Sequence, residues 1–134
     1  MRVRVFVLGI AALIVGVAPA LAHHSFAAEF DINKPVTLRG TLTKMEWVNP
    51  HGWIYIDVKG PDGKVVSWAV EAGATNQMLR RGLRQTDFQV GTEIVVEGYQ
   101  ARNGSPTANG STVKLSDGRN FFLGMPETGA PGPR

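Results

Sequence analysis

The three histidines of this chain, His23, His24 and His51, are the side chains best suited to chemistry. Imidazole is the commonest metal ligand among side chains, and it titrates near neutral pH. His23 and His24 are adjacent, whereas His51 lies in the segment Asn-Pro-His-Gly (49–52), which is typical of a turn. If the chain brings them together, their nitrogens would suit Cu(II), which favours tetragonal nitrogen and oxygen ligands.

The segment 1–22 has the three parts of a secretory signal. A basic start (1–4) precedes an apolar run of 13 residues (5–17), and Ala-Leu-Ala (20–22) forms a cleavage site. The apolar run is shorter than the roughly 20 residues that a membrane-spanning helix needs. We therefore expect export to the periplasm or beyond it, cleavage after Ala22, and no stable membrane insertion after cleavage.

Cleavage after Ala22 would make His23 the first residue of the mature chain. Its α-amine titrates at about pH 8 and is therefore more available to a metal than a lysine amine. The amine and ring of His23 would chelate one metal, and His51 would supply a third nitrogen if the N-terminal arm folds back over the turn. His24 would then be a supporting ligand. The sequence thus predicts copper, or another transition metal, bound by His23, His24 and His51.

Two other interpretations of these residues stand beside this one. His51 could simply fill its turn beside Trp47 or Trp53, with its ring bonded to the backbone. Alternatively, Met45 and Trp47 share one face of a strand and would offer softer ligands for Cu(I) together with His51. That set resembles the parts of small periplasmic OB-fold copper chaperones, although its order and spacing differ. Met45 and Trp47 are more typical of a hydrophobic core than of a metal site.

Several activities find no support in the sequence. There is no cysteine, no phosphate-binding loop, no dinucleotide fingerprint and no Ser-His-Asp spacing. The carboxylates of Glu29, Asp31, Glu46 and Glu71 are scattered, and nothing fixes two of them for general acid–base chemistry. We therefore expect no enzymatic activity and assign no catalytic residue.

Charge argues against nucleic acid as a partner. The full chain carries a net charge of +3, and loss of Arg2 and Arg4 with the leader lowers it to +1. A nearly neutral domain lacks the basic surface that nucleic-acid binding requires. The alternative to a metal-binding module is an accessory domain that docks on a periplasmic protein and has no ligand of its own.

Alternating apolar residues and turn signals divide the rest of the chain into elements. We expect an N-terminal arm (23–34) and a Pro/Gly-rich, disordered tail (124–134). A helix is expected over 75–83, with Thr75 as its N-cap and Gly82 as its terminator. The polar segment 102–111 predicts a flexible hairpin loop. Strands are expected over 36–48, 53–58, 65–71, 92–99 and, broken in the middle, 113–123.

This order of elements predicts the fold. Five short antiparallel strands would leave bare edges unless the sheet closed on itself. With a helix between the third and fourth strands, the order β-β-β-α-β-β is typical of a five-stranded OB-like barrel, here over 35–123. A small β-sandwich is the alternative.

Three stretches also carry a family resemblance: His-His-Ser-Phe (23–26), Glu-Phe-Asp (29–31) and Trp-Val-Asn-Pro-His-Gly (47–52). Over about residues 23–123 the chain resembles a family of small exported bacterial proteins classed only as a domain of unknown function. The resemblance implies export and a barrel-like β fold. It implies no substrate and no activity.

Overall fold

The computed structural model describes residues 25–124. The expected leader (1–22), His23, His24 and all but the first residue of the expected tail lie outside the described residues. No helix within 25–124 is both long enough and apolar enough to cross a membrane.

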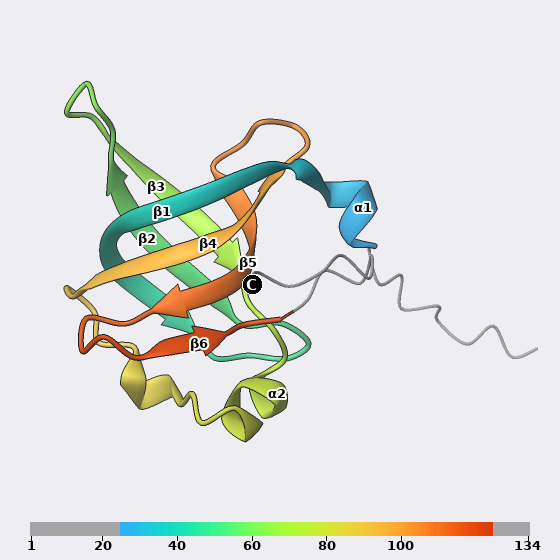
Figure 1. Cartoon of the computed structure of the whole chain (residues 1–134), viewed down its shortest axis with the longest axis vertical. Helices are drawn as coiled ribbons and strands as arrows, with labels where there is room; N and C mark the ends of the chain where they lie inside the picture. The colour runs from blue at the N-terminus through green and yellow to red at the C-terminus, as the bar shows by residue number, and fades with distance from the viewer. Residues whose placement is uncertain (1–24, 125–134) are drawn as a thin grey trace, which may run out of the picture.

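Six strands form one sheet that closes into a ring (Figure 1). The elements are α1 (Phe26–Glu29), β1 (Phe30–Glu46), β2 (Trp53–Lys59), β3 (Val65–Glu71), α2 (Thr75–Arg80), a 3-10 turn (Gln85–Asp87), β4 (Glu93–Ala101), β5 (Thr107–Lys114) and β6 (Asn120–Phe122). β1 pairs with both β2 and β4, β4 pairs with β5, and β5 pairs in parallel with β3. This last pairing closes the barrel. In chain order, α2 follows β3 and precedes β4. The OB-like barrel is therefore confirmed.

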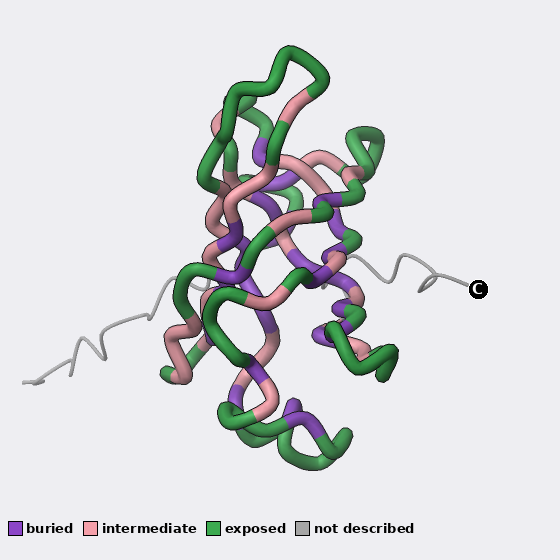
Figure 2. Tube along the Cα trace, turned by 90° about the vertical axis from the view of Figure 1, so that its left-hand side faces the viewer, coloured by how far each residue is buried: buried purple, intermediate pink, exposed green. Residues whose placement is uncertain are grey.

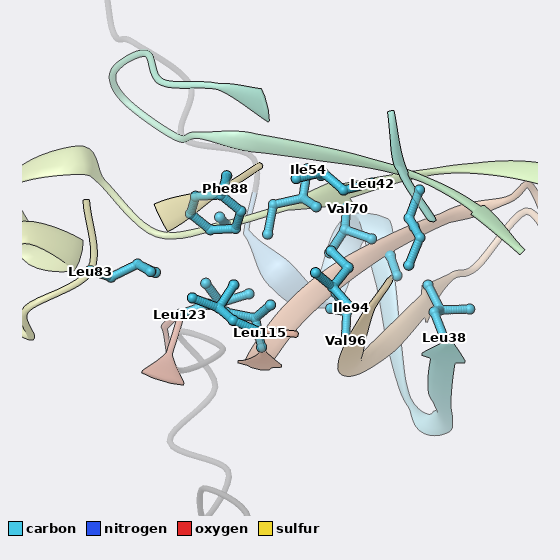
Figure 3. Packing of buried hydrophobic residues seen from close by; sticks show 14 of the residues in the cluster. Leu38, Leu42, Ile54, Val70, Leu83, Phe88, Ile94, Val96, Leu115 and Leu123 are labelled. Carbon is cyan, nitrogen blue, oxygen red and sulfur yellow. The ribbon is translucent and has the colours of Figure 1, made fainter. Parts of the chain in front are cut away.

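The core fills the barrel and extends beneath α2. Along β2 and β4, buried residues alternate with residues that are intermediate or exposed. Figure 2 shows how the buried positions are distributed along the chain. In Figure 3, Leu38 lies at one end of the apolar cluster, and Leu83 and Phe88 lie at the other. The side chains that are completely shielded from solvent share this interior: Leu42, Ile54, Ile56, Val70, Met78, Leu83, Val113 and Leu123. Burial of this apolar surface is the main force that holds the strands together.

The segment 102–111 was expected to be a flexible loop, and this expectation is wrong for its second half. β5 begins at Thr107 and forms a hairpin with β6, so the expected broken strand (113–123) is the end of β5 followed by β6. β6 is a sixth strand of the sheet that pairs with β5 alone, while β1 to β5 close the ring. The reason for the wrong expectation is close packing between β4 and β3. Ala108 and Gly110 are buried, and a Cβ atom on Gly110 would lie 2.9 Å from the Val70 side chain. Only small residues fit in this space. A strand made of such residues has the composition of a loop, which is why the sequence indicated one.

The end of the expected arm and the end and N-cap of the expected helix also differ from the prediction. The arm (23–34) contains α1, and β1 already begins at Phe30, five residues before the expected start of the barrel. α2 ends at Arg80 and its N-cap is Ala74, whereas Thr75 is its first residue. Gly82 adopts a φ of +83°, a conformation that L side chains rarely adopt, and so serves as the expected terminator.

Candidate functional site

The side chains of His51 and Glu71 form a contact at the surface of the barrel. His51 Nδ1 meets Glu71 Oε1, and the side chains are 43% and 12% exposed, respectively. An ionised carboxylate only accepts hydrogen bonds, so opposite such a group Nδ1 is the ring nitrogen that would carry the proton. In the neutral ring, this leaves Nε2 without a proton and with a lone pair available to a ligand.

The turn that carries His51 is held from one side by α2. Asn49 Oδ1 accepts hydrogen bonds from the backbone N–H of Thr75 at 3.3 Å and from its hydroxyl at 2.9 Å. The Asn49–Pro50 peptide bond is cis. Asn49 therefore satisfies a donor at the start of α2, and the same contact fixes the turn in place.

Backbone hydrogen bonds hold the turn from its other side. The Gly52 N–H donates to the Gly73 carbonyl at 3.2 Å, and the Ala72 N–H donates to the Gly52 carbonyl at 2.8 Å. These bonds join the residue after His51 to the residues after Glu71. Hydrogen-bonded backbone segments thus bring the two side chains together.

Glu71 belongs to a row of outward-facing residues that crosses four strands. Trp53 on β2 pairs with Glu71 on β3, Glu71 pairs with Asn109 on β5, and Asn109 pairs with Tyr99 on β4. Directly opposite residues share one face of a sheet. The Asn109 side chain hydrogen-bonds the Glu71 carboxyl group, so Glu71 is held between His51 and Asn109.

Burial is the largest influence on the carboxyl group of Glu71, and it raises the pKa. The charge of His51 and the hydrogen bonds from Asn109 and His51 act in the opposite direction, and the charge of Glu29 adds to the rise. The net result is a Glu71 pKa above its ordinary value. Glu29, the last residue of α1, is thus close enough for its charge to act on Glu71.

α1 is anchored to the barrel by an aromatic cluster next to this row. Phe26 is 6% exposed, and its ring meets the Tyr99 ring edge-on with centroids 5.7 Å apart. The Phe30 ring lies at the same centroid distance from Phe26, and Ala101 completes the cluster. Because Tyr99 is also the neighbour of Asn109, α1 packs at one end of the row that holds Glu71.

Arg102 adds two polar contacts to α1. Its guanidinium Nε donates to the Ala27 carbonyl at 2.7 Å, and its backbone N–H donates to the Glu29 carbonyl at 2.9 Å. The last carbonyls of a helix have no partner within the helix. Arg102 satisfies two such groups and so holds the arm against the end of β4.

The alternative soft ligands, Met45 and Trp47, are partly buried side chains. Met45 pairs with Ile54, whose side chain is completely buried, and the Trp47 ring lies 6.5 Å from that of Phe88. Both side chains pack against the core, whereas His51 contacts a carboxylate on the outer row. Among residues 25–124, no group of three or more His, Asp or Glu side chains could hold a metal ion.

The comparison with protein-family models decides the identity of the chain. Residues 11–111 match the model of a family of unknown function, DUF6152. The chain belongs to the DUF6152 family. The match includes the stretches 23–26 and 47–52 on which the resemblance rested, as well as Glu71 and Asn109. Searches of curated proteins and of solved structures found no match for this DUF6152 protein.

The sequence of the DUF6152 chain singled out His51 as a candidate but did not indicate its contact with Glu71 or the pairing of Glu71 with Asn109. The sequence contained a partial signal for the position of Glu71. Pairing the two strands outward from the Gly60–Gly63 turn places Glu71 opposite Trp53, and Trp53 lies two residues after His51. Asn109 had no such signal. It reaches Glu71 only because β5 closes the barrel against β3.

Proposed function

We propose that this protein is an exported binding module that holds a transition metal ion, with copper as the favoured metal. The α-amine and ring of His23 and the Nε2 atom of His51 would be its principal ligands, and His24 would support them. The observation that carries the proposal is the anchoring of α1 at one end of the row that contains Glu71, the contact partner of His51.

Chain length limits where the two N-terminal histidines can lie. Ser25 immediately precedes α1, and α1 is fastened to the barrel by Phe26 and Arg102. Two extended residues span at most about 7 Å. His23 and His24 therefore begin from a fixed point on the barrel, and His51 on the same barrel is fixed by its own turn.

The ligand chemistry favours Cu(II) over softer ions. An amine and imidazole rings supply nitrogen, and the chain has no cysteine. A histidine whose second nitrogen is hydrogen-bonded to a carboxylate is the usual arrangement around protein-bound metals, because the carboxylate orients the ring and increases its basicity. The His51–Glu71 pair has this arrangement.

The proposal is tested by titrating Cu(II) into the protein produced with His23 as its first residue, with detection by electron paramagnetic resonance. We expect one tight site with nitrogen hyperfine structure, weakened by more than an order of magnitude in His51→Ala. One glycine added before His23 should remove the amine from the ligand set and weaken binding as well.

The reference is a free peptide, His-His-Ser-Phe, which has the same terminus but lacks the barrel. Binding no tighter than that of the peptide, unchanged by His51→Ala, would refute the proposal. It would favour instead the accessory domain that docks on a periplasmic partner without a ligand of its own.

A further inference from the structure

We propose that Glu71 is a positioning residue that fixes the ring of His51 as the Nδ1–H tautomer and directs Nε2 away from the carboxylate, with Asn109 holding Glu71 in turn. The importance of this arrangement for metal binding rests on the function proposed above. The state of the ring does not, because it is a property of the metal-free protein.

The contact geometry determines which nitrogen carries the proton. His51 Nδ1 is the atom that meets Glu71 Oε1. The proton of a neutral imidazole resides on the nitrogen that donates a hydrogen bond, and the opposite nitrogen keeps its lone pair. In water the neutral histidine ring prefers its proton on Nε2, so the contact with Glu71 reverses the ordinary preference.

Glu71 can impose this state because it is itself fixed. Its side chain is only 12% exposed and lies between His51 and Asn109. The pairings with Trp53 and Asn109 hold its backbone on both sides, since β3 lies between β2 and β5. A carboxylate on a central strand has little freedom to turn toward solvent, so it serves as a rigid acceptor for Nδ1–H.

The geometry also indicates that Glu71 is not one of the metal ligands. One of its oxygens is engaged by His51, and Asn109 hydrogen-bonds the same carboxyl group. Glu71 therefore acts through His51, while His51 Nε2 is the atom that meets the metal. Loss of such an indirect partner typically lowers metal affinity about 10- to 100-fold.

The test of the ring state uses long-range proton–nitrogen NMR of the metal-free protein at mildly alkaline pH. His51→Ala identifies the His51 signals by their absence. We expect an unprotonated Nε2 and a protonated Nδ1 in the wild-type protein. Glu71→Met, which removes the acceptor, should return the ring to the Nε2–H form, and Glu71→Gln, which keeps one oxygen, should retain part of the Nδ1–H form.

A wild-type spectrum dominated by the Nε2–H form would overturn the inference, whether or not any variant folds. Glu97→Gln is the matched control, because it makes the same substitution at an exposed carboxylate that accepts from Thr112 on another part of the sheet. It should leave the His51 signals unchanged. A shift in the control as large as that in Glu71→Met would also count against a specific role for Glu71.

Copper titration of the same variants then tests the link to function. We expect affinity to fall about 10- to 100-fold in Glu71→Met, less in Glu71→Gln, and not at all in Glu97→Gln. If the wild-type ring is Nδ1–H but the protein binds no copper, the proposed function fails while the assignment of Glu71 stands. If copper binds and Glu71→Met leaves its affinity unchanged, the positioning role fails while the function stands.

Discussion

Removing the Phe26 side chain should release the N-terminal arm while the barrel stays folded. Phe26 is 6% exposed, and its partners, Phe30, Tyr99 and Ala101, form a cluster separate from the main core. Replacing a buried phenylalanine by alanine costs about 3–5 kcal/mol in a well-packed core. A small cluster at the surface can partly collapse, so we expect the lower value, about 3 kcal/mol.

This change should weaken the docking of α1 and leave the free energy of unfolding of the barrel nearly unchanged. A free-energy change of about 3 kcal/mol corresponds to roughly a 100-fold change in an equilibrium constant. The Arg102 amide reports docking, because it donates to the Glu29 carbonyl at 2.9 Å. We expect its hydrogen exchange to accelerate about 100-fold in Phe26→Ala. The Leu42 amide, which donates to Thr92 inside the barrel, should exchange at its wild-type rate.

Phe88→Ala is the matched control. Phe88 is 7% exposed, nearly the same as Phe26, but it belongs to the main core. Its removal should lower the midpoint of thermal unfolding and accelerate exchange throughout the barrel. The reasoning is refuted if Phe26→Ala lowers the midpoint as much as Phe88→Ala does, or if the exchange of Arg102 does not change.

Two further predictions concern the barrel itself. Gly98→Ala would place a Cβ atom 2.1 Å from the Asn109 carbonyl oxygen, so β4 and β5 must separate. We expect the free energy of unfolding, measured with urea, to fall by about 3 kcal/mol. Gly124→Ala, with 3.7 Å to its nearest neighbour, should be close to neutral, and equal losses in both would contradict this reasoning. The Arg119 guanidinium holds the pKa of Asp87 below its ordinary value. The pair therefore stabilises the folded protein at any pH above the Asp87 pKa of the unfolded chain, about 3.9. This stabilisation is lost as the pH falls through the lower pKa of Asp87 in the folded protein. Asp87→Asn should therefore lower the urea midpoint at neutral pH and match the wild type in strong acid; a difference that persists there would argue against the ion pair.

Much of the barrel could be predicted from local patterns. Strand β3 and most of β2 and β4 follow from runs rich in β-branched and aromatic residues that are bounded by turn signals. The turn at Gly60–Gly63 follows from its composition. The order of these elements, with a helix between the third and fourth strands, was then sufficient to indicate the closed barrel.

β5 could not be predicted in the same way, because its residues are selected by their neighbours. It pairs with β4 on one side and with β3 on the other, and it admits only small side chains where Gly110 meets Val70 and Leu123. Steric fit to distant segments leaves no periodic signal in the strand's own sequence. Its composition therefore matched that of a flexible loop.

The candidate site shows the same division. Local patterns were sufficient to place His51 in a turn and, through the register of the β2–β3 hairpin, to place Glu71 opposite Trp53, which lies two residues after His51. The position of Asn109 next to Glu71 and the docking of α1 nearby could be seen only in the folded chain. The physical reason is that these contacts depend on closure of the barrel, which brings together residues from opposite ends of the chain.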